Sequence, residues 1–180
     1  VASVNPGIEV AEGEVGFELR NGEVLAVTGG SWPFMGGELI LRAVDLNLGV
    51  SEERRYIFEI VGLDAGTFVT EMDLENISAT GLFDGAVPIV FDANGNGRID
   101  TGVLISRPPG GTVSYVGELT YEDLSPIANF AFDALKSLDY SQMRVIMEGP
   151  LTGEIVTRVR FDGVRQGEGA KSNFVTRRLA

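Results

Sequence analysis

The residues best suited to chemistry lie in one short segment, where oxygen-bearing side chains alternate with small residues. Four of them occupy positions 1, 3, 5 and 9 of a calcium-loop pattern that also has glycine at position 6: Asp92, Asn94, Asn96 and Asp100. Calcium takes about six to eight oxygen ligands, and an acid normally closes the loop at position 12, which here is Val103. The flanking residues 87–91 and 103–105 have strand-like sequences. The pattern therefore favours a plain turn between two strands, with a weak structural calcium site as the alternative.

The rest of the sequence offers little to a catalyst. It has no cysteine and no histidine, which removes thiol nucleophiles, disulfides, and imidazole bases and metal ligands. Acidic residues are abundant, but no spacing selects an acid/base pair, and neither a phosphate-binding glycine loop nor a Gly-x-Ser-x-Gly motif occurs. We therefore expect a non-enzymatic protein that binds no cofactor other than the weak calcium candidate. A hydrolase with paired carboxylates is the least favoured alternative.

Charge and hydrophobicity narrow the class of protein further. The 180 residues include 14 Lys and Arg against 26 Asp and Glu, a net charge of −12. No basic run is interleaved with aromatic residues before the C-terminal end, so we expect no nucleic-acid partner. With 44% hydrophobic residues the chain is apolar enough to fold. It contains no run of about 18 apolar residues that would span a membrane.

Glycine punctuation indicates many short strands. The 24 glycines separate runs rich in Val, Ile, Leu, Phe and Thr, as in a β-meander. The clearest hairpin joins residues 14–20 to residues 23–28 through Asn21-Gly22, a pair typical of a type I′ turn. The turn predicts three cross-strand pairs: Arg20 with Glu23, Leu19 with Val24 and Phe17 with Ala26.

The apolar pattern changes parity within residues 38–48. Leu39 and Leu41 share one parity, whereas Val44 and Leu46 share the other. Such a slip predicts a β-bulge near Ala43-Val44, which would bend the strand and curve the sheet.

Strands are also expected at residues 54–61, 77–82, 86–91, 98–106, 112–116, 142–148 and 154–161. Phe83-Asp84-Gly85 is predicted to be a turn. A short helix is expected at about residues 65–72 with Asp64 as its N-cap. A long helix is expected from Ser125-Pro126 to about Leu138, with an apolar stripe that would cover the sheet.

These elements predict a mainly β fold: a curved, twisted antiparallel meander, shaped like a trough or an open barrel, with one long covering helix and one short helix. Residues 1–163 would form a single β-rich module that is part of a longer protein. Residues 164–180 would be a polar tail or the start of a truncated element.

The large apolar side chains carry most of the functional information. Each one taken alone is best explained as core, but a long meander that does not close could instead hold lipid chains on its inner face. The residues that strand alternation favours as lipid-facing are Phe17, Leu19, Leu39, Leu41, Phe58, Ile89, Phe91, Leu104 and Tyr115.

Ordered glycine-containing motifs between about residues 30 and 163 resemble those of a known family. They are Trp32-Pro-Phe-Met-Gly-Gly37-Glu-Leu, Ala79-Thr-Gly81-Leu-Phe83-Asp-Gly85-Ala-Val-Pro88, Asp100-Thr-Gly102, Pro109-Gly-Gly111-Thr-Val-Ser-Tyr115 and Ala134-Leu135-Lys-Ser-Leu138-Asp-Tyr140, with Gly153 beyond. In order and spacing they resemble the YdbH-like proteins, also known as a dicarboxylate-transport domain, within the AsmA-like group that includes TamB. The chain departs from the family pattern after Gly163, where Arg165 to Lys171 are mostly polar.

The resemblance implies part of a long, strand-built protein of the Gram-negative cell envelope that moves phospholipids between the inner and outer membranes. It implies a location on the periplasmic face of the inner membrane and anchoring by an N-terminal segment outside this sequence. The implied partners are phospholipid acyl chains, the remainder of the same chain and other envelope proteins, with membrane contact made elsewhere in the protein. Two alternatives stay open: a structural or interaction domain with a self-packed core, with or without a stabilising calcium ion, and a transport-associated domain for small dicarboxylates. A dicarboxylate site would need converging Arg or Lys residues, which are dispersed here.

Overall fold

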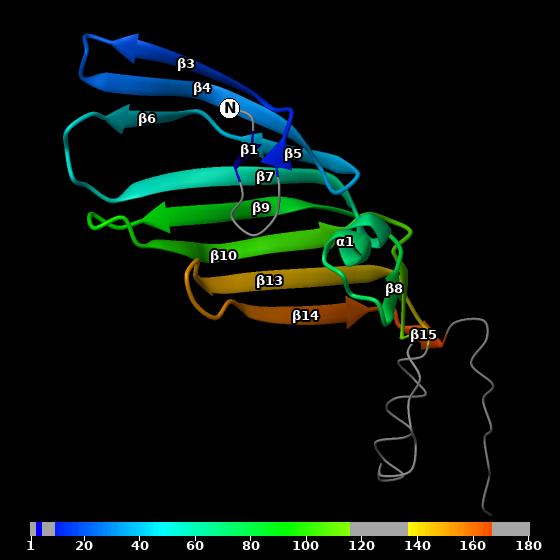
Figure 1. Cartoon of the computed structure of the whole chain (residues 1–180). Helices are drawn as coiled ribbons and strands as arrows, with labels where there is room; N and C mark the ends of the chain where they lie inside the picture. Colours follow the sequence, from blue (N-terminus) through cyan, green and yellow to red (C-terminus); the bar gives the residue numbers. More distant parts are fainter. Residues whose placement is uncertain (1–2, 5–9, 116–136, 167–180) are drawn as a thin grey trace, which may run out of the picture.

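The structure is a computed structural model that describes residues 3–4, 10–115 and 137–166. A nine-stranded antiparallel sheet, the main sheet, forms the body of the molecule (Figure 1). Its strands are β3 (Glu14–Arg20), β4 (Val24–Phe34), β5 (Gly37–Leu41), β6 (Val44–Asn47), β7 (Arg54–Asp64), β9 (Leu82–Phe91), β10 (Gly97–Ser106), β13 (Gln142–Pro150) and β14 (Val156–Asp162). They run in the order β14-β13-β10-β9-β7-β5-β4-β3, and β6 also pairs with β4.

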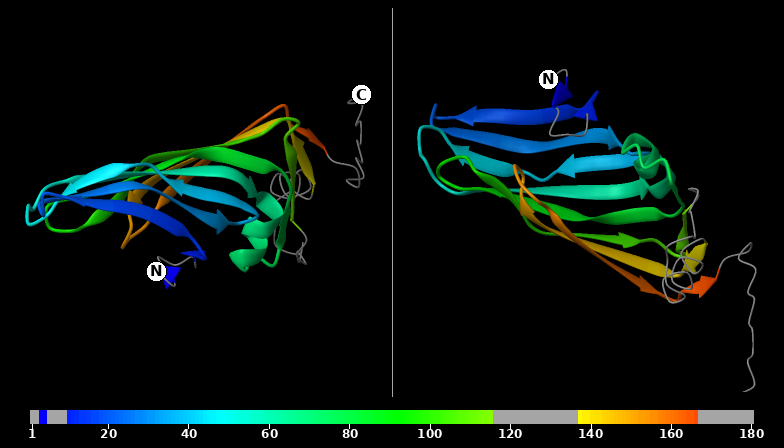
Figure 2. Two further views of the ribbon diagram at one scale, coloured as in Figure 1. Left: turned by 90° about the horizontal axis from the view of Figure 1, so that it is seen from above. Right: turned by 60° about the horizontal axis from the view of Figure 1, so that its bottom comes forward.

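When only the strands of the main sheet are counted along the chain, six of its eight pairings join successive strands, as the meander prediction requires; the exceptions are β5 with β7 and β4 with β6. The described parts of β3 and β14 form the two edges and do not pair with each other, so the sheet is open. Figure 2 shows it as a twisted, curved layer. The predicted class, a curved antiparallel meander that does not close into a barrel, is confirmed.

Between β7 and β9, and again between β10 and β13, the described chain leaves the main sheet at the same end, and the elements formed there cover that end. The elements there are α1 (Ala65–Glu71) and a four-stranded sheet of β8 (Ile77–Ala79), β11 (Gly111–Tyr115), β12 (Leu138–Tyr140) and β15 (Arg165–Gln166). A small separate pair joins β1 (Ser3–Val4) to β2 (Val10–Ala11). β15 lies within the segment that was predicted to be a polar tail. The α1 end is opposite the β6–β7 loop and the tip of the β9–β10 hairpin, which together we call the hairpin tips (Figure 1).

Helix α1 begins where the sequence predicts. The Asp64 carboxylate accepts hydrogen bonds from the backbone N–H of Thr67 at 2.7 Å and from its hydroxyl at 2.8 Å, which satisfies donors that a helix start leaves free. It is the one helix among the described residues. Most of the predicted long helix lies outside the described residues, but Leu138, its predicted last residue, belongs to strand β12 instead.

The first hairpin has the predicted turn but a different register. Asn21 and Gly22 both have positive φ, 53° and 73°, and the Glu23 N–H donates to the Arg20 carbonyl at 3.1 Å. The ladder, however, pairs Arg20 with Val24, so the predicted pairing was wrong by one residue. Glu23 stays outside the ladder because its carbonyl accepts from the Leu48 N–H on the other side, at 2.7 Å.

The parity slip predicted near Ala43-Val44 is a break between β5 and β6 rather than a bulge. Both strands pair with β4, through Leu41 with Gly30 and Val44 with Val27. Two residues separate these pairs on each strand, so no extra residue is inserted. The bulge prediction was therefore wrong in form, although the irregularity lies at the expected place.

Phe83-Asp84-Gly85, predicted to be a turn, lies inside strand β9, and that prediction was wrong. A Cβ at Gly85 would overlap the Val103 carbonyl oxygen of β10. The glycine is needed because a neighbouring backbone comes close. The surrounding sequence does not show whether a glycine serves such a close approach or a turn.

A self-packed core fills the end covered by α1 and the second sheet. Its buried residues are Met35, Ile60, Leu63, Ala65, Phe83, Leu104, Tyr140 and Met143. They come from both sheets and from α1, so this end is held together by long-range packing.

Candidate functional site

One side of the main sheet carries a continuous apolar surface. Residues opposite each other on neighbouring strands share a face, so the observed register links them into rows. One row crosses seven strands through Trp32, Leu39, Ile60, Gly85, Leu104, Val145 and Val159. Two parallel rows contain Leu41, Phe58 and Val87, and then Tyr56, Ile89 and Ile99. Together with Phe91, these three rows define what we call the apolar face.

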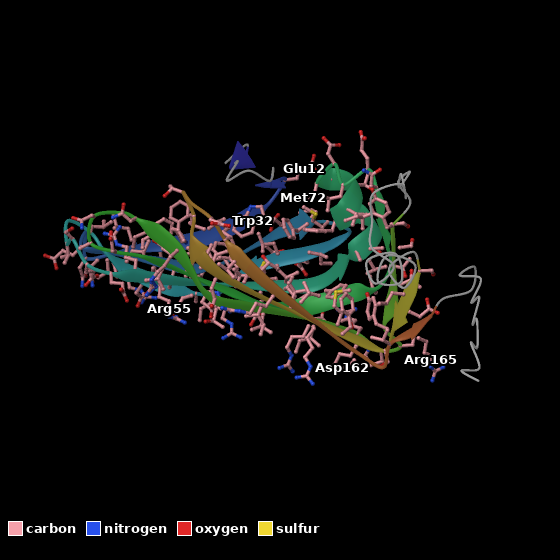
Figure 3. All side chains as sticks on the ribbon, turned by 90° about the horizontal axis from the view of Figure 1, so that it is seen from below. Glu12, Trp32, Arg55, Met72, Asp162 and Arg165 are labelled. Carbon is pink, nitrogen blue, oxygen red and sulfur yellow. The ribbon has the colours of Figure 1, made fainter. Side chains whose placement is uncertain are left out.

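The other side of the main sheet is charged. Arg55 contacts Asp100 at 2.6 Å, and Arg158 contacts Glu148 at 2.9 Å. Arg42, the residue after β5, pairs with Glu59 of β7. In Figure 3, Trp32 lies on the side where α1 is found, whereas Arg55 and Asp162 point away on the opposite side. The ion pairs named here therefore lie on the side away from the apolar face, a side that also carries the apolar residues Ile57, Pro88 and Val90.

The charged side also accounts for one of the shifted acids. Hydrogen bonds to Glu148 from Arg158, and then from Thr101 at 3.0 Å, lower the pKa of that carboxyl. Both partners are structural neighbours in the sheet, which gives this shift no catalytic meaning.

The predicted lipid-facing residues divide into a covered and an uncovered group. Leu104 belongs to the self-packed core with 9% of its surface exposed, and Leu39 packs against that core. Leu41, Phe58, Ile89 and Phe91 lie farther toward the hairpin tips, where they are half-buried and outside the core cluster. Among the described residues, the self-packed core thus covers the apolar face at the α1 end, and these four residues lie outside that core.

The other predicted residues lie at the margins. Phe17 and Leu19 are on the edge strand β3, with 70% and 59% of their surfaces exposed. Tyr115 lies on β11, opposite Ile77 in the second sheet, so the main-sheet rows do not include it. Strand alternation could have found Tyr56, which shares the parity of Phe58. It could not have found Trp32, because the strand was predicted to end at residue 28 and β4 continues to Phe34.

A pocket of about 500 Å³ opens at the hairpin tips, at the end of the apolar face opposite α1. The β6–β7 loop, the β9–β10 turn and three strand residues line it: Gly49, Val50, Ser51, Glu52, Arg54, Tyr56, Phe91, Asp92, Ala93 and Gly95. The Tyr56 and Phe91 rings meet edge to face with their centroids 5.8 Å apart. Sequence reasoning missed Arg54, although it shares the parity of Tyr56 and Phe58 within β7.

The segment with the calcium-loop pattern forms the turn between β9 and β10. Asp92 Oδ1 accepts from the backbone N–H groups of Asn94 at 2.8 Å and Asn96 at 2.9 Å, and Oδ2 accepts from the Asn96 side chain. These bonds, the Asn96 side chain first, lower the pKa of Asp92. Asp100 pairs with Arg55. Within the described residues no group of three or more acidic side chains is arranged to hold a metal ion.

Three further observations bear on identity. None of the helices described is long and apolar enough to cross a membrane. Comparison with curated proteins found no match, and comparison with solved structures found none either. A family model described as the intermembrane phospholipid transport protein YdbH matches residues 1–172, and the chain therefore belongs to the YdbH-like family.

Proposed function

We propose that the chain is a non-catalytic section of a bridge-like protein that carries phospholipids through the periplasm between the inner and outer membranes, with the acyl chains lying on the apolar face. The observation that carries this proposal is the half-buried part of that face outside the self-packed core, around Leu41, Phe58 and Ile89, on an open sheet whose other side carries ion pairs. Half-buried apolar side chains that continue over neighbouring strands outside the core suit an apolar ligand.

The energetics suit a surface along which a lipid moves. Fully burying one methylene group contributes about 0.8 kcal/mol. Ten methylene groups on a one-sided face, each about half covered, would therefore contribute about 4 kcal/mol. That is enough to hold a chain out of water, and small enough to release it.

The remaining parts of the proposal concern the protein beyond this sequence. We place the inner-membrane anchor in an N-terminal segment outside these residues and membrane contact in other parts of the protein. The partners would be phospholipid acyl chains, neighbouring segments of the same chain and envelope proteins. The edges β3 and β14 have unpaired backbone groups along one side within the described residues, which suits pairing with such neighbouring segments.

A second candidate is a structural or interaction domain whose apolar residues serve only its own packing. The self-packed core around Phe83 and Tyr140 favours it at the α1 end. On this alternative the half-buried residues nearer the hairpin tips would stay free of lipid.

One measurement on a matched pair of variants distinguishes the two candidate functions. Ile89 and Ile57 are both half-buried isoleucines on neighbouring strands, but Ile89 lies on the apolar face and Ile57, opposite Pro88, lies on the other. Native mass spectrometry would report phospholipid bound to protein purified under mild conditions. We expect Ile89→Asp to lower the bound fraction about tenfold or more, because a carboxylate would have to lose water against an acyl chain.

Ile57→Asp should leave the bound fraction near that of the wild type. Both substitutions remove a comparable apolar contact, so circular dichroism and urea unfolding would show whether either variant loses its fold. A wild-type chain free of phospholipid, or an equal loss of lipid in two folded variants, would contradict the proposed function.

A further inference from the structure

The pocket at the hairpin tips continues the apolar face. Arg54, Tyr56 and Phe58 alternate along β7 and pair with Phe91, Ile89 and Val87 of β9, so the pocket-lining residues Arg54, Tyr56 and Phe91 share the apolar face. Strands β6 and β7 are not paired with each other, and the loop between them forms one wall of the pocket. A molecule lying on the apolar face would therefore reach this pocket at its end.

Arg54 brings a positive charge to the apolar face. Its neighbour Arg55 turns to the opposite side and pairs with Asp100. Arg54 forms no ion pair within the described part of the chain. One nitrogen, Nη2, donates to the Val50 carbonyl at 3.0 Å, while Nε is buried without a partner. A guanidinium has five N–H donors, and the described residues give Arg54 one acceptor, the Val50 carbonyl, so its Nη groups keep donors for an anionic ligand.

The same pocket has two acids as well. Asp92 is occupied by the N–H groups of its own turn. Glu52 Oε1 accepts from the Asn47 side chain at 2.8 Å, and no described residue donates to its Oε2. The lining therefore has one positive and two negative side chains. This balance disfavours a simple anion and suits a ligand with a phosphate and an ammonium group.

The part of the apolar face outside the core is nearly as long as the rest of such a ligand. From Phe91 to Val87, which packs against the core, β9 spans four residue steps, or about 13 Å at about 3.3 Å each. The acyl chains of one leaflet occupy about 15 Å, half of a hydrocarbon core about 30 Å thick. A head group in the pocket would thus leave its chains on the apolar face, pointing toward α1.

We propose that this pocket binds the head group of an ethanolamine phospholipid, with the phosphate on Arg54 and the ammonium on Glu52. A primary ammonium can donate hydrogen bonds to Glu52, which a quaternary ammonium cannot. The inference rests on the proposed function and adds to it a head-group preference and a fixed orientation of the lipid.

The test uses the whole chain exchanged against mixed vesicles with equal amounts of phosphatidylethanolamine and phosphatidylglycerol, followed by native mass spectrometry. We expect the wild type to favour phosphatidylethanolamine by about fivefold. Glu52→Gln should abolish this preference, and Arg54→Gln should lower binding of both lipids by about tenfold. Arg55→Gln, the neighbouring arginine on the charged side, is the matched control and should change neither quantity.

The outcomes separate this inference from the proposed function. Phospholipid bound without head-group preference, or equally in Arg54→Gln and Arg55→Gln, would overturn the head-group site and leave the apolar face intact. Loss of bound lipid on adding inorganic phosphate would also overturn it, because that result indicates a plain anion site. A wild-type chain that takes up no phospholipid from any vesicle would overturn both.

Discussion

Tyr140 holds the closed end of the apolar face together, and its replacement by phenylalanine tests that role quantitatively. Its side chain is 3% exposed, and its hydroxyl donates to the Thr80 carbonyl at 2.7 Å, linking β12 to a residue 60 positions earlier in the chain. Burial raises the pKa of Tyr140 to about 12 from the usual 10.0. Tyr140→Phe keeps the ring and removes both the hydrogen bond and the titration.

At pH 8 the variant loses one hydrogen bond, which is worth about 1 kcal/mol of unfolding free energy. The raised pKa means that Tyr140 stabilises the fold below pH 10 and that this contribution is lost as the pH rises toward about 12. A shift of about two pKa units corresponds to at most about 2.7 kcal/mol, and about half of it is lost by about pH 11. The wild type should therefore be the more stable protein at pH 8 and become the less stable one above about pH 11.

Urea unfolding of both proteins at several pH values between about 8 and 11.5 measures this difference. The other tyrosines are present in both proteins and cancel in the comparison. Tyr56→Phe is the control, because no described residue bonds its hydroxyl, and it should change stability at pH 8 by less than about 0.5 kcal/mol. A Tyr140→Phe variant whose stability relative to the wild type stays constant with pH would refute the reasoning.

Three other predictions follow from single contacts. Arg107 donates to both carboxylate oxygens of Asp84, at 2.6 and 2.7 Å, and lowers its pKa; Asp84→Asn should cost about 1 kcal/mol at pH 7 for this half-exposed pair. Because the folded-state pKa is depressed, that difference should vanish as the pH falls below about 4, measured by urea unfolding. Gly85→Ala should cost about 1–3 kcal/mol in thermal unfolding, since its Cβ would overlap the Val103 carbonyl. Calcium should leave the melting temperature unchanged, because Asp92 already accepts hydrogen bonds from its own turn; a rise of several degrees would favour a structural calcium site.

Features that depend on local sequence were predicted well. The alternation of apolar and polar residues correctly indicated most strands and the open, mainly β class, because side-chain direction in a strand depends only on position along it. The Asp64 cap was predicted for a similar reason: a helix start needs an acceptor within three residues. The family resemblance drawn from motifs between residues 30 and 163 was confirmed by a match over residues 1–172.

Features that depend on a distant strand were not predicted. The register of the first hairpin differs from the prediction because the Glu23 carbonyl accepts a hydrogen bond from the Leu48 N–H, in the connection between β6 and β7. Gly85 allows the backbone of β10 to come close and is not part of a turn. In each case the deciding atom belongs to a residue more than fifteen positions away, which no local pattern contains.

The sequence by itself determined that the chain has a large apolar surface on short strands and few groups for catalysis. Only the tertiary structure decided which part of that surface the protein covers. Strand alternation predicts the same inner face for Leu104 and Ile89. In the structure α1 and the second sheet pack over the region of Leu104, whereas Ile89 lies outside the core. Likewise Arg54 and Arg55 are adjacent, but only the pairing of β7 with β9 places Arg54 beside the pocket and Arg55 near Asp100. Burial is a property of what packs against a residue, and the packing partners here come from distant parts of the chain.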